Sequence, residues 1–144
     1  MNYKVLSVRQ PFATLLVSGI KDVENRSKKT NFRGTVLIHA SATMHDRVAE
    51  LKGVPGFKLS PVDRKILATS EVVDLYPYAQ MSAIIGSVDI VDCVQDSKSD
   101  WAEEGSWHWV CANAKLFEKP ITGVKGKLGL WDWEGSIPDL EEQV

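Results

Sequence analysis

Residues 19–26 of the chain, GIKDVENR, place a lysine, a carboxylate and an arginine within six positions. If residues 22–26 are extended, Glu24 and Arg26 project from the same face, about 7 Å apart along the strand. Lys21 then lies at the junction between a helix and this strand, where its side chain can lean over that face. Such a set can hold a phosphate or polarise a carbonyl, while the carboxylate orients the cations or accepts a proton. The same residues also fit an ordinary salt-bridged surface patch.

The residues before this stretch predict a strand and a short helix. Apolar and polar residues alternate through VLSVRQ, residues 5–10, as they do on a strand. Pro11 suits the first turn of a helix, because its missing N–H costs nothing there. Apolar residues then recur at helical spacing over about 11–18, and Gly19 is placed to cap the end of this helix.

Further strands are predicted downstream, separated by few helices. TVLIHA, residues 35–40, is apolar on both faces and predicts a buried central strand. SAIIGSVDIVDCV, residues 82–94, is the longest strand signal, and Gly86 within it is a candidate bulge or barrel bend. Single strands separated by few helices favour a small curved or barrel-like α+β domain. The other elements expected are strands over 107–112, 115–118 and 126–133, helices over 43–52 and 61–74, and a frayed acidic tail after Trp133.

Composition bounds the class of protein. A chain of 144 residues with 44% hydrophobic and 25% charged residues predicts one globular domain rather than a disordered segment. No run approaches the roughly 20 apolar residues of a membrane span, and the N-terminus lacks the apolar core of a signal peptide. Cys93 and Cys111 are too few for a disulfide framework. We therefore expect a soluble, cytoplasmic protein with no membrane partner.

Positive charge is concentrated at the start of the chain. Residues 1–40 carry a balance of +5, whereas the whole chain carries −2. Clustered cations in an acidic chain predict a local anion-binding face. Lys28, Lys29 and Arg33 are expected to contact phosphates and to add salt-dependent affinity without specificity. A solvated lysine-rich loop is the alternative interpretation.

Arg9 and Gln10, at the end of the first strand, are expected to border the same cleft and to offer donors to a phosphate or a base. His39 and Ser41 end the strand over 35–40 and share a face, so His39 can act as the base for a nucleophilic Ser41 if the two are in hydrogen-bond reach. A satisfied core histidine is the simpler alternative for His39. Trp107 follows a polar linker that can form one wall of the cleft, and it is a candidate for stacking on bases.

Several kinds of site are not predicted. The chain has no phosphate-binding GxxxxGK[ST] loop, no GxGxxG after a strand and no GxSxG nucleophile elbow. The histidines are too scattered for a catalytic zinc site, which needs three protein ligands. No metal or other cofactor is therefore expected. Asp89 and Asp92 interrupt an apolar strand, and a buried carboxylate there needs a partner that Lys21 or Arg26 could provide.

Five blocks in order resemble the ASCH family (activating signal cointegrator homology) of the PUA-like superfamily. The most diagnostic is GxKxxExR, matched by Gly19, Lys21, Glu24 and Arg26. The blocks together are LSVRQPFA, GIKDVENR, FRGTVLIHAS, AIIGSVDIVDCV and KGKLGLWDW. The resemblance runs from about residue 4 to 133 and departs at Phe12, where the family often has tryptophan. It implies a PUA-like mixed β-barrel with flanking helices, a single domain over 1–135 followed by an acidic tail over 136–144.

The resemblance also implies a function. Related domains bind RNA or other nucleic acids, with the GxKxxExR segment lining the cleft. One bacterial branch removes the acetyl group from N4-acetylcytidine with a lysine, a threonine and a glutamate; the lysine corresponds to Lys21. The threonine position holds Glu24 here, so that hydroxyl is missing, and Asp89 is only a candidate for the glutamate. Ribonuclease activity is a further chemistry that the resemblance leaves open.

The sequence therefore predicts that RNA or a nucleotide-like small molecule binds around Lys21, Glu24 and Arg26. The alternative is a hydrolase acting on a modified nucleoside or the RNA backbone. In it Lys21 is the general base or electrostatic stabiliser, with Glu24 or Asp89 as its acid–base partner. A third interpretation is an interaction module whose cleft takes an acidic peptide. The oligomeric state does not follow from the sequence.

Overall fold

The computed structural model describes residues 1–44 and 80–141, which form one six-stranded sheet with two short helices. The strand order is β2-β5-β4-β3-β1-β6. Only β1 and β3 pair in parallel, and the other four pairs are antiparallel. The strands are β1 Asn2–Gln10, β2 Val23–Arg26, β3 Gly34–Met44, β4 Ala83–Val94, β5 Trp107–Ile121 and β6 Leu130–Glu134, and the helices are α1 Phe12–Val17 and α4 Pro138–Glu141.

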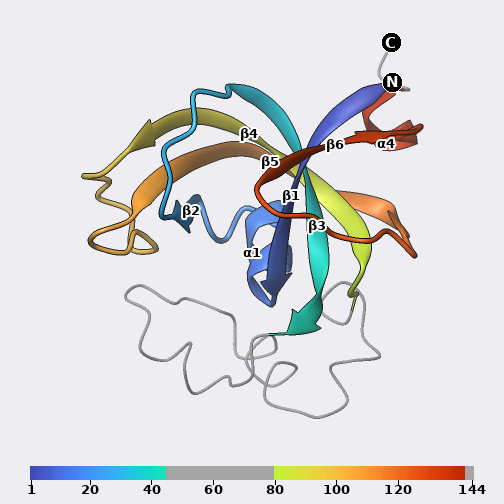
Figure 1. The fold of residues 1–144 in the computed structure, drawn as a ribbon, viewed down its shortest axis with the longest axis horizontal. Coiled ribbons are helices and arrows are strands. Elements are labelled where there is room, and N and C mark those ends of the chain that lie inside the picture. Colours follow the sequence, from blue (N-terminus) through green and yellow to red (C-terminus); the bar gives the residue numbers. More distant parts are fainter. Residues whose placement is uncertain (45–79, 142–144) are drawn as a thin grey trace.

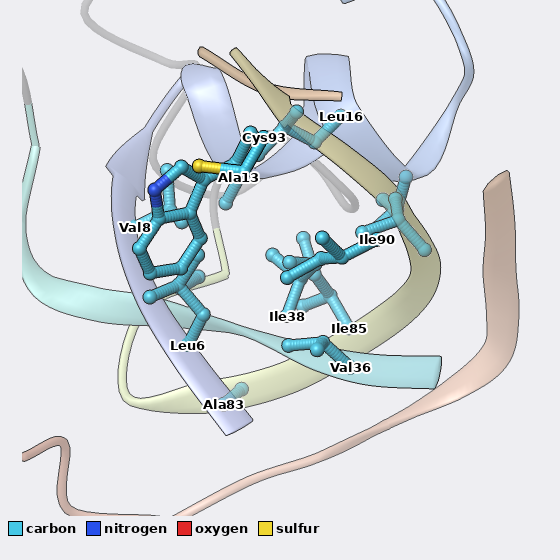
Figure 2. Packing of buried hydrophobic residues seen from close by; sticks show 14 residues of the cluster. Leu6, Val8, Ala13, Leu16, Val36, Ile38, Ala83, Ile85, Ile90 and Cys93 are labelled. Atoms are coloured by element: carbon cyan, nitrogen blue, oxygen red, sulfur yellow. The ribbon is translucent and has the colours of Figure 1, made fainter. Parts of the chain in front are cut away.

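The sheet curls around α1, as Figure 1 shows. Every residue of α1 after Phe12 is buried, because the helix packs into the concave side of the sheet. Side chains from β1, α1, β3 and β4 point toward one another in this core (Figure 2). A second cluster, which includes Val5, Leu37 and Trp131, fills the other side. The expected curved, mixed α+β architecture is confirmed.

Two glycines shape this packing. Gly19 follows α1 with φ +80°, so it ends the helix in the left-handed region that glycine adopts without strain. A Cβ on Gly86 would lie 2.7 Å from Val17 Cβ and would also meet the Lys115 carbonyl. The register between β4 and β5 shifts beside Gly86. The expected irregularity at this glycine, a bulge or a bend, is confirmed as a register shift, and the missing Cβ lets α1 lie directly against β4.

Other expectations are corrected by the structure. The segments 107–112 and 115–118 are one long strand, β5, which passes Asn113 at φ +52° instead of breaking there. The last strand begins at Leu130 rather than 126. The helix expected over 61–74 lies outside the described residues, and of the one over 43–52 only residues 43–44 are described, as the end of β3.

The tail expected to fray is ordered up to residue 141. Ile137 is buried within the second core cluster, and Leu140 packs against it. The Tyr3 hydroxyl donates to Glu141 Oε1 at 2.6 Å. Burial and this hydrogen bond to the carboxylate raise the pKa of Tyr3 to about 12. Apolar residues within an acidic segment thus fix it to β1.

Candidate functional site

The central residues of the site lie on and beside β2. This short strand pairs antiparallel with the start of β5, so that Glu24 faces Trp109 and Arg26 faces Trp107 across the ladder. Glu24 and Arg26 project from one face, as the alternation of a strand requires. Lys21 precedes the strand, and its N–H donates to the Leu15 carbonyl at the end of α1 at 2.9 Å. The placement predicted for these three side chains is what the structure shows.

Their charged groups form one chain of contacts. Lys21 Nζ lies 3.3 Å from Glu24 Oε1, and Arg26 Nη2 lies 2.8 Å from Glu24 Oε2. Lys21 Nζ also donates to the Val23 carbonyl. Lys21 is 5% and Glu24 8% exposed, so each charge depends on these partners to offset the loss of water. This is a buried ion-pair network rather than a solvated surface patch.

Arg26 joins β2 to the far side of the curved sheet. Its Nη2 donates to the Ser7 carbonyl on β1 at 2.9 Å, and its guanidinium lies 6.0 Å from the ring centre of Trp109. The Lys21 ammonium lies 5.7 Å from the ring centre of Phe12. Both cations are therefore held over aromatic faces, an arrangement that is favourable for a positive charge.

These side chains line a pocket of about 590 Å³. That volume is within the range of about 300–1,000 Å³ that is typical of small-ligand sites. Eight of its ten lining residues are polar, and they include three cations and two carboxylates. The lining consists of Ser7, Val8, Arg9, Phe12, Lys21, Glu24, Asn25, Arg26, Ser27 and Glu103. The arrangement can bind a small polar molecule by hydrogen bonds and charge.

Comparison with known proteins places this architecture in a family. A model of the ASCH domain matches residues 6–121, which include the whole of β2 and the pocket. The chain belongs to the ASCH domain family. It is also similar to Activating signal cointegrator 1 of Homo sapiens and of Mus musculus, at 30% identity over 141 residues in each case. The match covers 92% of this chain and 22% of each relative, so the chain spans about a fifth of the length of these proteins.

Six of the ten lining residues were not predicted as site residues from the sequence, namely Ser7, Val8, Phe12, Asn25, Ser27 and Glu103. Glu103 belongs to the polar segment between β4 and β5, which was expected to offer Trp107 to the cleft. Trp107 is instead half-buried against the core and lies outside the pocket lining. The Lys29 ammonium covers its ring at 5.6 Å from the centre. Trp107 therefore lies beside the loop that follows β2 and carries Lys28, Lys29 and Arg33.

Of the two candidate site residues at the end of β1, Arg9 lines the pocket and Gln10 does not. Arg9 is exposed and lines the pocket, as expected. Gln10 is fully buried, with its side-chain oxygen accepting hydrogen bonds from the Thr14 N–H and hydroxyl. Its amide group donates to the Gln80 carbonyl. Gln10 thus anchors the first turn of α1 and lies outside the pocket lining.

The three flanking cations follow β2 in the loop leading to β3. Lys28 and Lys29 are exposed, and the Lys28 carbonyl accepts a hydrogen bond from the Trp109 indole at 3.0 Å. Arg33 Nη2 is 3.8 Å from Asp92, and its Nη1 donates to two carbonyls of its own loop. The ASCH domain therefore places these cations outside the pocket, with Lys28 directly after the pocket-lining Ser27 in the chain.

His39 belongs to a different part of the domain. It is fully buried, with Nδ1 accepting from the Ser7 hydroxyl at 3.0 Å and Nε2 donating to the Val124 carbonyl at 2.6 Å. Burial lowers its pKa. The hydroxyl at its Nδ1 is that of Ser7, and Ser41, half-buried further along β3, lies outside the pocket lining as well. Both ring nitrogens of His39 are used to tie β1, β3 and the loop before β6 together.

Asp89 does not pair with Lys21 or Arg26. Its carboxylate accepts from the Thr35 hydroxyl at 2.7 Å and from the Asn113 amide at 2.9 Å. The expected pairing was wrong because the register of β4 places Asp89 opposite Thr35 on β3 and beside Asn113 on β5. Lys21 and Arg26 pair with Glu24 instead. Asp89 therefore stands apart from the pocket.

The described residues show neither a metal site nor a reactive thiol at Cys111. Within residues 1–44 and 80–141, no three His, Cys, Asp or Glu side chains gather as a metal site. Burial, and next the charge of Glu24, raise the pKa of the Cys111 thiol to about 12. No helix in the described part of the ASCH domain is long and apolar enough to cross a membrane.

Proposed function

We propose that this ASCH domain binds RNA, or a nucleotide-like ligand, in the pocket around Lys21, Glu24 and Arg26. The observation that carries the proposal is a polar pocket of ligand size with a buried ammonium and a guanidinium at its lining. Membership in the ASCH family supports it, because the family is associated with nucleic acids.

The cations retain donors that a ligand can use. An ammonium has three N–H groups, and two of those of Lys21 point to Val23 O and Glu24 Oε1. Arg26 donates from Nε to Glu24 and from Nη2 to the Ser7 carbonyl. Its Nη1 donates to no protein acceptor within the described residues. Arg9 adds a second exposed guanidinium at the pocket. A phosphate or a base carbonyl fits these donors.

Glu24 acts as the residue that keeps the cations in place. Both of its oxygens already accept hydrogen bonds from positive groups, so it fixes their positions before any ligand arrives. Donors that are held in advance lose little conformational freedom on binding. The three lining cations exceed the two lining carboxylates by one positive charge, which suits a ligand with few negative charges, such as a nucleotide, better than a bare multivalent anion.

Lys28 and Lys29 extend the positive surface beyond the pocket. They follow Ser27, which is itself a lining residue, and both are exposed. A single strand whose nucleotide occupies the pocket would pass its neighbouring phosphates near this loop. These contacts would release counterions from the RNA, so the affinity they add would fall as the salt concentration rises.

Fluorescence anisotropy of labelled single-stranded RNA tests the proposal. Wild type is expected to bind, with affinity falling as salt rises, and Lys21→Ala is expected to weaken binding at every salt concentration. Lys119→Gln removes an exposed cation near the other end of β5 and is expected to bind like wild type. Circular dichroism checks that Lys21→Ala is folded. Absence of wild-type binding tighter than about 100 μM at low salt, which is weaker than ordinary non-specific binding, refutes the proposal.

A hydrolase acting on a modified nucleoside or on the RNA backbone is a second candidate. The 3.3 Å distance between Lys21 Nζ and Glu24 Oε1 favours it, since such a pair can move a proton in a small polar pocket. Incubation with acylated nucleosides and RNA, with mass spectrometry of the products, tests it. Turnover lost in Lys21→Ala would support a hydrolase, and no turnover by wild type would leave binding alone.

A further inference from the structure

Glu103 gives the pocket an acceptor that its cations do not engage. Glu103 is exposed and is one of the lining residues, and no hydrogen bond or ion pair within the described residues uses its carboxylate. We propose that Glu103 makes the pocket selective for nucleobases that combine an amino group with a carbonyl, an inference that rests on the nucleotide-binding function proposed above. Cytosine and guanine have this combination.

The main chain of Glu103 is held on both sides. Its N–H donates to Asn25 Oδ1 at 2.9 Å, and Asn25 belongs to β2, next to Glu24. Its carbonyl accepts from His108 Nε2 at 2.7 Å. His108 is buried on β5, and its Nδ1 accepts from the Ser97 N–H, which fixes the tautomer that donates to Glu103. The carboxylate therefore starts from a fixed point beside the strand that carries the cations.

The segment that carries Glu103 is held against β2 and the end of α1 by hydrogen bonds of Trp101. The Trp101 side chain is buried, and its indole N–H donates to the Ile20 carbonyl at 3.0 Å. The Asn25 amide donates to the Trp101 carbonyl at 2.9 Å. Asn25 thus spans Trp101 and Glu103 and ties the segment to β2. The anchored main chain limits the positions that the exposed Glu103 carboxylate can take, which lowers the cost of ordering this acceptor when a ligand binds.

The pocket lining offers a partner for each of the two kinds of group on such a base. The free donors of Lys21 and Arg26 suit a carbonyl oxygen. An ionised carboxylate such as Glu103 can only accept, and carboxylates in proteins accept from the amino group of cytosine. Uracil presents a carbonyl oxygen where cytosine has this amino group, so it would face Glu103 with like polarity. Adenine has the amino group but no carbonyl for the cations.

Binding of matched nucleotides tests this. Cytidine and uridine 5′-monophosphates carry the same sugar and phosphate, and so do guanosine and inosine 5′-monophosphates, which differ in one amino group. Dissociation constants are measured by NMR titration for wild type, Glu103→Gln and Glu104→Gln. Glutamine both donates and accepts, so it removes the discrimination while keeping the shape. Glu104 is the matched control, since it is exposed, lies next in the chain and is outside the pocket lining.

Wild type is expected to bind the amino-bearing member of each pair about 3- to 10-fold more tightly, the value of one hydrogen bond. In Glu103→Gln the ratio is expected to approach one, and Glu104→Gln is expected to keep the wild-type ratio. Each variant loses one negative charge, so a general gain in phosphate affinity appears in both and leaves the ratios unchanged.

Other results would overturn the inference. Lys21-dependent nucleotide binding without a preference, or a preference that survives in Glu103→Gln, rejects the role of Glu103 and leaves the proposed function standing. If neither the nucleotides nor single-stranded RNA bind wild type, the proposed function fails, and this inference fails with it.

Discussion

Replacing Glu24 by glutamine tests whether one carboxylate holds two cations at the pocket. The change keeps the size of the side chain and removes its charge. It removes the compensating charge from Lys21 and Arg26, which lie 3.3 and 2.8 Å from the Glu24 carboxylate in the native chain.

The structure sets the expected loss of stability. Removing one member of a buried ion pair costs roughly 3–5 kcal/mol. The Arg26 side chain is 29% exposed and can turn to water, and Lys21 keeps the Val23 carbonyl, so the lower end applies. We expect a loss of about 3 kcal/mol in the free energy of unfolding, which for a chain of this size lowers Tm by about 6–12 °C.

Urea and thermal unfolding, followed by circular dichroism, measure this loss. Asp132→Asn is the control, because it breaks an ion pair with Lys4 at 2.9 Å in which Asp132 is 73% exposed. Such a pair is worth less than about 1 kcal/mol. Adding Lys21→Met to Glu24→Gln is expected to recover part of the loss, because it removes an uncompensated charge. Phosphate is expected to stabilise Glu24→Gln more than wild type.

The reasoning is refuted if Glu24→Gln lies within about 0.5 kcal/mol of wild type, the size of an ordinary surface substitution. It is also refuted if the effects of Lys21→Met and Glu24→Gln simply add, since residues in one charged network should show coupling.

Three further predictions concern residues outside the pocket lining. Gly86→Ala should lower stability by about 1–3 kcal/mol in urea unfolding, because its Cβ would press on Val17 and the Lys115 carbonyl; a neutral effect would contradict the close packing of α1. Since burial lowers the pKa of His39 from its ordinary 6.5, the unfolded chain binds more protons below that pH, and stability should fall on acidification below about pH 6.5. His39→Gln should flatten this dependence, and an unchanged slope would reject the assignment. Cys111 is half-buried, and with its pKa of about 12 it should resist iodoacetamide at pH 8 until urea unfolds the chain; rapid labelling at Cys111 in the native protein, located by mass spectrometry, would contradict the raised pKa.

The core of the site was predictable because it is local in the chain. Glu24 and Arg26 are two residues apart on a strand, so the alternation alone places them on one face. Lys21 precedes them at the end of a helix whose closing glycine is visible in the sequence. Gly86 was predictable for a similar reason, since a glycine within an apolar strand indicates a close approach of backbone.

Contacts between distant segments were not predictable in this way. Glu103 is one of two adjacent glutamates, and only the bonds of its main chain to Asn25 and His108 place it at the pocket. Asp89 has its partners on β3 and β5, where register decides which side chains meet. The continuity of β5 through Asn113 depends in the same way on pairing with β4, because the local sequence indicates a break.

The position of bound RNA tests the central claim most directly. Mixed-sequence single-stranded RNA is crosslinked to the full chain by ultraviolet light, and the modified residues are located by mass spectrometry. We predict crosslinks within residues 7–12 and 21–27 and at Glu103 or its neighbours, with Phe12 as the aromatic residue at the pocket. Crosslinks confined to the loop before β6, or to the second core cluster around Trp131 and Trp133, would contradict the account.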